Sequence, residues 1–342
     1  MSPETIGPYR ILEPLREGGV SSVYKAVGPA GASVALKVFS TRVLAAPAHL
    51  ASPPGSAASP PSAGRAGASP PAAPPSRAGD LVSRFHREVR AIVPLSHPNI
   101  LQVLETGEDG DRLYIATELF AGVSLERLLK ERRLTVPQSI AVLRAVCRGL
   151  GFAHSRGCVH GHLSPRHVLV SRDVSAVKIA DFGPSEIDVV SELDSTLRTG
   201  AYALGSMVYL APEQTERRGA PPDPRSDLYA AGVIFVELLT GRPPTGRLAL
   251  PSHVNAELPP ATDVLVLKCL DRDPAKRYPT ATALLADLDR LEEAMRVRLL
   301  SHLRGISRLL GPPGTLRRTL LLASFALLLI ALALAGYFLA GR

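Results

Sequence analysis

The chain has 342 residues, and 46% of them are hydrophobic, so it can bury at least one large core. Of its net charge of +8, seven charges come from arginines beyond residue 295, which leaves only +1 for residues 1–295. A nearly neutral globular part lacks the basic face that binding to nucleic acid requires, so no nucleic-acid partner is expected.

Alternating apolar and polar residues dominate the N-terminal third of the chain and predict antiparallel β-strands. The predicted strands are residues 9–15, 20–27, 33–39, 101–106 and 112–118. The segment Glu108-Asp109-Gly110-Asp111 predicts a hairpin turn between the last two strands. Between the third strand and the fourth, Asp80 could cap a helix that Pro94 would end. These elements predict a small, mainly β lobe with one helix.

A segment of unusual composition, residues 45–79, separates the third predicted strand from the predicted helix. Nine Pro, twelve Ala, six Ser and four Gly fill 31 of its 35 positions, and such a mixture cannot build a packed core. The segment is therefore predicted to be a disordered insertion that interrupts a domain without dividing it. Because long surface loops cost little free energy, an insertion without a role is the simplest interpretation.

From about residue 124 onward, apolar residues recur at helical spacing and predict a larger, mainly helical lobe. They include Leu125, Leu128, Leu129, Ile140, Leu143, Val146, Cys147 and Leu150. The three cysteines, Cys147, Cys158 and Cys269, show no paired spacing, and the N-terminus has no pattern of a cleaved secretion signal. We therefore expect buried free thiols in a reducing compartment.

Residues 319–340 are a run of 22 uncharged, mostly apolar residues. As a helix this run would be about 33 Å long, compared with about 30 Å for the hydrocarbon core of a bilayer. The preceding segment, 296–318, contains six arginines and no acidic residue, which by the positive-inside rule predicts that it lies in the cytoplasm. We expect a single-pass protein of the cell membrane with a cytoplasmic N-terminal domain, whose arginines also attract anionic lipid. A buried core helix is the alternative for the apolar run, and a surface helix of the domain is the alternative for the first half of 296–318.

Short motifs follow one another along the chain in a fixed order. They are Val34-Ala35-Leu36-Lys37, Phe85-His86-Arg87-Glu88, the loop 158–170, Asp181-Phe182-Gly183, Ala211-Pro212-Glu213, the segment 226–232, and Asp273-Pro274-Ala275-Lys276-Arg277. Over residues 9–290 their order and spacing resemble the protein kinase superfamily, and within it the bacterial membrane-anchored Ser/Thr protein kinases. The resemblance implies an α+β, bilobal protein-kinase-like fold, with a small antiparallel β lobe and a larger helical lobe, here followed by one C-terminal transmembrane helix.

The resemblance also implies that ATP is the cofactor, together with Mg²⁺ or Mn²⁺. Lys37 would contact its phosphates and pair with Glu88, and Asp181 would bind the metal. Thr117 would be the gatekeeper of the adenine pocket, and Glu118 to Ala121 would face the adenine. An internal spine would be built from Ile92, Val103, His160 and Phe182, with Asp227 anchoring its base.

The loop that covers the phosphates in this family departs from its pattern. Where the family has G-x-G-x-x-G, residues 16–21 read Arg-Glu-Gly-Gly-Val-Ser, so that only the middle glycine, Gly18, remains, followed by Gly19, while Arg16 and Ser21 replace the other two. Both of these side chains could intrude above the nucleotide. We therefore expect nucleotide binding that is weakened and not lost.

The catalytic loop departs further. Its pattern, H-R-D-L-x-x-x-N, is here His-Gly-His-Leu-Ser-Pro-Arg-His over residues 160–167. The general base is replaced by His162, the metal-binding Asn by His167, and the Lys that usually follows the Leu by Ser164. A missing base lowers the transfer rate about 10²–10⁴-fold, from about 1–100 s⁻¹ for a working kinase. Gly161 replaces the Arg that pairs with a phosphorylated activation loop, so control by phosphorylation within 184–204 is not expected.

These replacements predict a membrane-tethered pseudokinase that keeps weakened ATP binding and acts in signalling through protein partners. The alternative is an active but unorthodox Ser/Thr protein kinase in which neutral His162 serves as the base. A different transferase chemistry on the same fold is a third possibility. His167 beside Asp181 could also form a metal site that favours Mn²⁺ or Zn²⁺ over Mg²⁺, or both histidines could simply fill space in a degenerate site.

Overall fold

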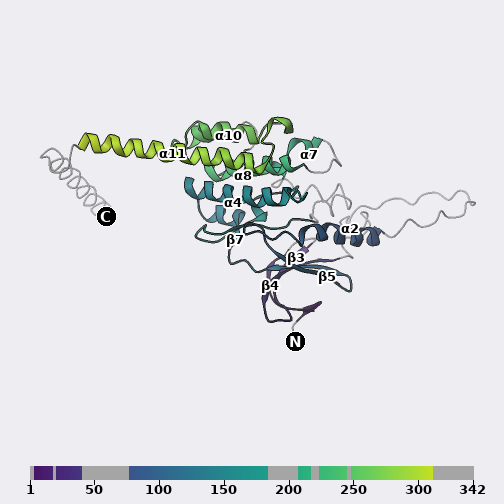
Figure 1. Ribbon diagram of the computed structural model, residues 1–342. Coiled ribbons are helices and arrows are strands. Elements are labelled where there is room, and N and C mark those ends of the chain that lie inside the picture. Colours follow the sequence, from purple (N-terminus) through teal and green to yellow (C-terminus); the bar gives the residue numbers. More distant parts are fainter. Residues whose placement is uncertain are drawn as a thin grey trace, which may run out of the picture. The chain divides into compact units, whose positions relative to one another are not determined.

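The computed structural model describes residues 4–17, 21–40, 77–183, 207–216, 223–244 and 248–310. The chain divides into two compact units, residues 1–288 and 289–342. The first unit holds the sheet and the helices that form the candidate site (Figure 1). The described part of the second unit, residues 289–310, is helical throughout.

The first unit begins with a six-stranded sheet whose strand order is β1-β2-β3-β4-β6-β5, and every neighbouring pair is antiparallel. The strands are β1 (Thr5–Ile6), β2 (Tyr9–Arg16), β3 (Ser21–Val27), β4 (Ser33–Ser40), β5 (Val103–Asp109) and β6 (Arg112–Glu118). The five predicted strands are confirmed to within a few residues. β1 was not predicted, since two residues are too few for an alternating pattern. The predicted turn 108–111 is shorter than expected, because Glu108 and Asp109 extend β5 and Gly110, at φ 61°, makes the turn.

The alternation along β4 decides which side chains reach the candidate site. Val34 and Leu36 are buried in an apolar cluster on one face of the sheet, where they pack with Tyr9 and Tyr114 of neighbouring strands. Because successive side chains of a strand point to opposite faces, Ala35 and Lys37 point the other way. The apolar cluster therefore fixes the register that presents Lys37 to the site.

Helix α2 (Arg77–Ile92) packs beside the sheet through one apolar stripe (Figure 1). Phe85, Val89 and Ile92 follow the spacing of one helix face and are buried. The ring of Phe85 meets that of Phe39 on β4 edge to face, with centroids 5.7 Å apart. This contact ties α2 to the strand that carries Lys37.

The predicted start of α2 is wrong. The helix begins at Arg77, so Asp80 lies inside it and is not its cap, and the last three residues of the predicted insertion 45–79 are helical. Arg and Ala are good helix formers, and an acidic residue in the first turn is favoured by the helix dipole. The other residues of the insertion lie outside the described part of the chain. The predicted end is close, since the helix ends at Ile92 and Pro94 follows two residues later.

The rest of the first unit is mainly helical, as predicted. Its helices are α3 (Leu125–Glu131), α4 (Val136–His154), α7 (Pro212–Glu216), α8 (Pro224–Thr240), α9 (Pro251–Val254), α10 (Ala261–Cys269) and the start of α11 (Ala281–Leu310), with 3₁₀ turns η2 (Pro165–His167), η4 (Met207–Tyr209) and η5 (Pro274–Lys276). A small sheet, β7-β8-β9, joins Val123–Ser124, Val168–Val170 and Val177–Ile179. A capping box between Thr135 and Gln138 starts α4.

Helix α8 is the centre of this lobe, because 13 of its 17 residues are buried. It packs against α4 and α10. At Gly232 a Cβ atom would lie 2.4 Å from the Cβ of Cys269 on α10, so only glycine allows this approach. The helix begins at the cap Asp223 and ends at Gly241, whose φ of 81° is the left-handed conformation that glycine adopts readily.

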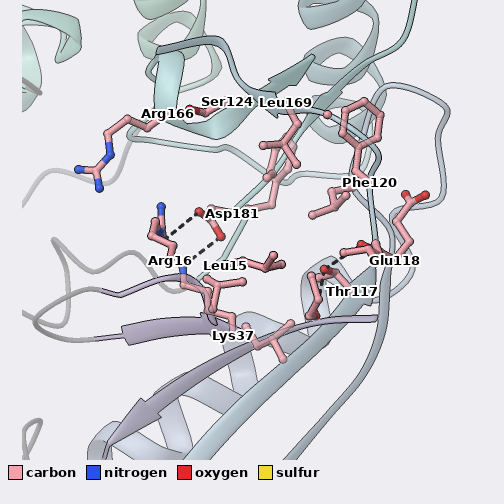
Figure 2. A pocket seen from close by; sticks show the side chains of 18 of the residues that line it. Leu15, Arg16, Lys37, Thr117, Glu118, Phe120, Ser124, Arg166, Leu169 and Asp181 are labelled. Carbon is pink, nitrogen blue, oxygen red and sulfur yellow. Dashed lines mark hydrogen bonds and ion pairs between the residues drawn. The ribbon is translucent and has the colours of Figure 1, made fainter. Parts of the chain in front are cut away.

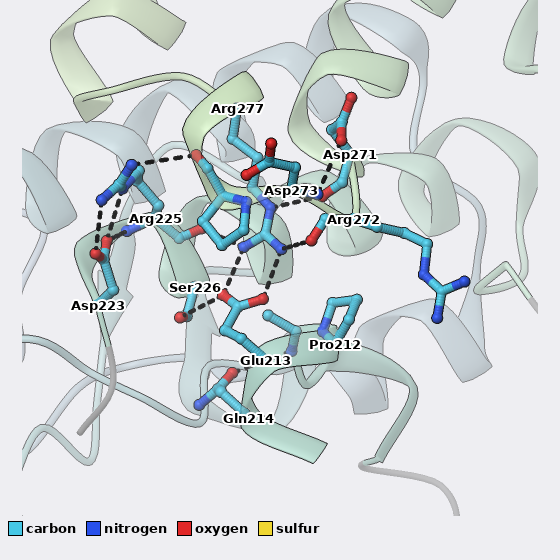
Figure 3. A network of polar contacts seen from close by, with 12 residues as sticks. Pro212, Glu213, Gln214, Asp223, Arg225, Ser226, Asp271, Arg272, Asp273 and Arg277 are labelled. Carbon is cyan, nitrogen blue, oxygen red and sulfur yellow. Dashed lines mark hydrogen bonds and ion pairs between the residues drawn. The ribbon is translucent and has the colours of Figure 1, made fainter. Parts of the chain in front are cut away.

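A buried ion pair joins α7 to the segment before α11 (Figure 3). Arg277, whose side chain is 0% exposed, donates to both carboxylate oxygens of Glu213 at 2.7 Å. Ser226 on α8 donates to the same carboxylate at 2.9 Å. Arg277 also donates to the carbonyl of Asp271 at 2.7 Å, so one guanidinium joins three parts of the lobe.

The three cysteines are free thiols, as predicted, but only two of them are buried. Burial raises the pKa of Cys147 to about 12 and also raises that of Cys269. Cys158 is partly exposed, and its thiol lies 3.4 Å from the carbonyl oxygen of Ala91 at the end of α2.

In the part of the chain that the structure describes, no helix combines the length and the apolar character needed to cross a membrane. The predicted span 319–340 lies outside that part and stays a prediction. Helix α11 continues to Leu310, so the first part of the predicted basic segment 296–318 is helical.

Candidate functional site

A cavity of about 430 Å³ lies between the six-stranded sheet and the helical lobe. Figure 2 shows its two ends, with charged side chains at one end and the segment after β6 at the other. The apolar lining comes from both lobes and includes Leu15, Val23, Ala35, Ile115, Val123 and Leu169. A cavity with apolar walls and a few charged groups at one end suits a ligand with a flat apolar part and an anionic part.

The charged end is built around Asp181. Lys37 Nζ lies 3.0 Å from Asp181 Oδ1, and Arg16 Nη2 lies 3.9 Å from Asp181 Oδ2. Burial alone would raise the pKa of Asp181, but the neighbouring positive groups, above all Lys37, outweigh it and lower the pKa below the usual value. Asp181 is therefore ionised at neutral pH. With two cations around one carboxylate, this end carries a net positive charge, and the Arg16 side chain occupies part of the cavity beside the carboxylate.

Asp181 also has an unusual backbone, since its φ of 62° lies in the left-handed region. Asp enters this region more readily than most residues, and such conformations concentrate at functional sites. The residue lies two positions after the end of β9 and precedes Phe182, which is buried. The turn thus directs the carboxylate into the cavity while Phe182 packs into the core.

The two residues that replace glycines in the phosphate loop, Arg16 and Ser21, are placed differently. Arg16 does line the cavity and reaches Asp181, as the sequence predicted. The prediction was wrong for Ser21, which is 3% exposed and does not line the cavity. Ser21 pairs with Phe39 in the register of β3 and β4, so its side chain is held within the sheet.

The far end of the cavity is formed by Thr117 and the residues after it (Figure 2). Thr117 donates through Oγ1 to the carbonyl of Ala35, with 3.3 Å between the oxygens. The carboxylate of Glu118 accepts from Lys178 Nζ at 2.7 Å and from the backbone N–H of Gln102 at 2.8 Å. The side chain of Glu118 is therefore already paired, and its backbone N–H donates to the carbonyl of Gln102 at 3.0 Å.

Three residues assigned to the nucleotide cannot be placed in the site. Gly18 and Gly19 lie outside the described residues, and so does the side chain of Glu88 on α2. The predicted pair of Lys37 with Glu88 therefore stays a prediction. In the described residues, the lysine is paired with Asp181.

Asp227 on α8 anchors the backbone near the start of the loop 158–170. This carboxylate, 1% exposed, accepts from the backbone N–H groups of His160 and Gly161, each at 2.8 Å. The ring of His154 lies 2.8 Å from the same side chain. The predicted anchoring by Asp227 is thus confirmed, and it fixes the backbone at the start of the loop.

The imidazole rings of His160, His162 and His167 lie close to one another in this loop. The ring centroids of His160 and His162 are 4.4 Å apart, those of His162 and His167 are 4.8 Å apart, and those of His160 and His167 are 5.4 Å apart. His160 also packs on Phe182 at 4.9 Å, as expected for the internal spine, of which Ile92 and Val103 are buried as well. The sequence singled out His162 and His167 but assigned His160 only to the framework, so the cluster of three was missed.

All three rings are neutral at pH 7. Burial lowers the pKa of His160, and it lowers that of His162 well below the usual value, with His160 and His167 adding to the effect. Burial and the proximity of His160 lower the pKa of His167 to about 3. Each nitrogen without a proton is therefore a lone-pair donor at neutral pH, but a weak base.

The cavity fits a nucleotide better than it fits the family's metal. Lys37 and Asp181 are placed to meet phosphates, and the apolar walls suit a base. The two residues that the sequence assigns to the metal offer one carboxylate, Asp181, and one imidazole, His167. Mg²⁺ prefers an all-oxygen set, so this donor pair does not suit it.

Comparisons with known proteins agree with the fold. Residues 75–288 match the protein kinase domain family. The Ser/Thr-protein kinase PknL of Mycobacterium tuberculosis is 38% identical over 235 residues, which cover 64% of this chain and 57% of the relative. The Ser/Thr-protein kinase PknB of Mycolicibacterium smegmatis is 32% identical over 253 residues, which cover 68% of this chain and 40% of the relative. The chain thus spans about half the length of these relatives.

A solved structure gives the same result for the architecture. The crystal structure of the Mycobacterium tuberculosis PknI kinase domain matches with a TM-score of 0.62 and 23% identity, covering 85% of this chain and 98% of that one. The structural match covers 85% of the chain, which is more than the residues 75–288 that match the family. The chain therefore belongs to the protein kinase domain family and has its bilobal fold.

Proposed function

We propose that this chain is a membrane-tethered pseudokinase, a domain of the Ser/Thr protein kinase type that binds ATP weakly, transfers phosphate poorly and acts in signalling through protein partners. The observation that carries the proposal is the histidine cluster in the catalytic loop. His162 and His167 stand where the family has its general base and a metal ligand. The nucleotide-facing Lys37 and Asp181 are present and paired at 3.0 Å.

Poor transfer is supported by the chemistry of His162. A general base is most effective when its pKa lies near the working pH. The pKa of His162 is well below 6.5, because the ring is buried and lies beside two other imidazoles. The ring can accept a proton, which is the basis of the alternative of an active, unorthodox kinase, but desolvation and the two neighbouring imidazoles disfavour the charged form that results.

Weak ATP binding is supported by Arg16. In the family this position is a glycine that leaves room above the nucleotide. Here the guanidinium enters the cavity and lies 3.9 Å from Asp181, so the phosphates and any accompanying metal must displace it.

Nucleotide binding is tested by thermal unfolding of the full chain, purified in detergent, with increasing ATP. We expect ATP to raise the unfolding temperature and Lys37→Met to weaken ATP binding about 10–100-fold, the effect of losing a hydrogen bond between charged groups. Arg16→Gly should tighten binding up to about 5-fold, because its partly exposed ion pair with Asp181, at 3.9 Å, is worth at most about 1 kcal/mol. No stabilisation by ATP, or equal stabilisation of the Lys37→Met variant, would contradict the proposal.

Membrane tethering is supported by the 22 uncharged residues at 319–340 and the arginines before them. The tether would hold the domain at the cytoplasmic face, with lipid contacts through the Arg-rich segment and protein partners in the cytosol or the membrane. In cell fractionation, the full chain should sediment with membranes and the chain without 319–342 should not. If the shortened chain stays in the membrane fraction, the tether is wrong.

A further inference from the structure

The three histidines of the catalytic loop form a cluster with the geometry of a metal site. His160 and His162 lie two residues apart in the loop, and His167 ends the 3₁₀ turn η2. One nitrogen from each ring lies within 4.8 Å of one nitrogen from each of the other two. In a tetrahedral site with metal–nitrogen bonds of about 2.0–2.1 Å, such nitrogens are about 3.3 Å apart. Side-chain rotations that draw the rings together by about 1.5 Å or less would therefore complete the site.

His160 provides an independent observation that points to a ligand. Its Nε2 lies 3.1 Å from the carbonyl of Ala180, which can only accept, so Nε2 carries the proton and Nδ1 carries a lone pair. The residue is 3% exposed, and among the described residues Nδ1 has no hydrogen-bond partner. Buried polar atoms are nearly always satisfied, and an unpaired imidazole lone pair is what a metal ion requires.

The surroundings of the other rings are those of metal-binding histidines. His167 Nδ1 lies 3.2 Å from Ser164 Oγ, a contact of the kind that orients the ring and leaves Nε2 available. Ser164 replaces the lysine usual in this family, so no ammonium group from that position repels a cation. Asp227 holds the backbone at His160 and Gly161 through two hydrogen bonds of 2.8 Å, which keeps the loop rigid.

Two cations and one carboxylate lie near the cluster and act on it in opposite senses. The positive charges of Lys37 and Arg16 near His167 disfavour the binding of a further cation, whereas the negative charge of Asp181 favours it. Asp181 is itself paired with Lys37 at 3.0 Å.

We propose that His160, His162 and His167 bind a divalent transition metal, of which Zn²⁺ is the best match, and leave a fourth coordination position open. Imidazole suits Zn²⁺ and its neighbours in the first transition row, while Mg²⁺ selects oxygen ligands. Three histidines with an open position are a known ligand set of zinc. The inference goes beyond the proposed function, because metal binding requires neither a nucleotide nor phosphoryl transfer.

The test is a calorimetric titration of the full chain with ZnCl₂ in the absence of nucleotide. The chain is purified in detergent with a tag that contains no histidine and is stripped with EDTA. We expect one Zn²⁺ per chain and a Kd that rises at least about 100-fold in His162→Ala and in His167→Ala, since losing even a supporting residue costs about 10–100-fold. His253→Ala is the matched control, because His253 is exposed on α9, outside the cluster, and its loss should leave the Kd unchanged.

Two readouts on the unmutated chain keep the test independent of how the variants fold. Zn²⁺ should raise its unfolding temperature, and Co²⁺ should give the visible absorption of a tetrahedral nitrogen site that Zn²⁺ then abolishes. Absence of both signals would overturn the proposal, and so would an unchanged Kd in folded His162→Ala and His167→Ala. Because no nucleotide is present, the outcome does not depend on whether the chain binds ATP.

Discussion

Restoring the family's residues in the catalytic loop should convert this chain into a working kinase. In the triple variant His162→Asp, Ser164→Lys and His167→Asn, we expect phosphoryl transfer to rise by about 10²–10⁴-fold, the typical contribution of a general base. The structure favours such a rescue, because Asp227 anchors the backbone of the loop and Lys37 already faces Asp181. The measurement is incorporation of labelled phosphate from ATP, into the chain or a general protein acceptor.

The control is the same triple variant with Lys37→Met added, which should fall back to the rate of the unmutated chain. A triple variant that folds and binds ATP but transfers no faster than the unmutated chain would show that the loop is not the cause of poor transfer. The phosphate loop with Arg16 would then be the next candidate.

Removal of Arg277 should have the largest effect on stability. Its guanidinium is 0% exposed and makes two hydrogen bonds of 2.7 Å to Glu213, so Arg277→Ala leaves a partly buried carboxylate without its cation (Figure 3). Breaking a fully buried pair in this way costs about 3–5 kcal/mol, so with Glu213 21% exposed we expect a loss of about 3 kcal/mol, at the low end of this range. Urea unfolding of the full chain, with and without the substitution, measures the loss in the free energy of unfolding.

A neighbouring arginine provides the matched control. Arg225 pairs with Asp223 at 3.0 Å, but both side chains are more than a third exposed. Exposed pairs contribute about 0–1 kcal/mol, so Arg225→Ala should cost far less than Arg277→Ala. Equal losses from the two changes would mean that burial does not determine the strength of the Arg277 pair.

The sequence predicted the fold well where a physical pattern is repeated. Alternation identified the five longer strands, and helical spacing identified the mainly helical lobe. It failed at boundaries that no pattern marks, such as the two-residue strand β1 and the start of α2 at Arg77, which lies inside a segment whose composition indicated disorder.

The candidate site was predictable in its chemistry but not in its geometry. The sequence identified Arg16 as an intruding side chain, which the structure bears out, but it gave Ser21 the same role. Motif spacing says nothing of side-chain direction, and the strand places Ser21 inside the sheet. The sequence also singled out His162 and His167, but not His160, for a metal site or as space-filling residues. The packing of His160 against them depends on contacts across the loop, which spacing alone does not reveal.

Phosphoryl transfer by the unmutated full chain tests the central claim most directly. The chain would be incubated with labelled ATP and either Mg²⁺ or Mn²⁺, alongside the Lys37→Met and His162→Ala variants. The account predicts that ATP stabilises the chain while incorporation of label stays at the level of the Lys37→Met variant. Incorporation well above that level, lost in a folded His162→Ala variant, would contradict it and identify an active kinase that uses His162 as its base.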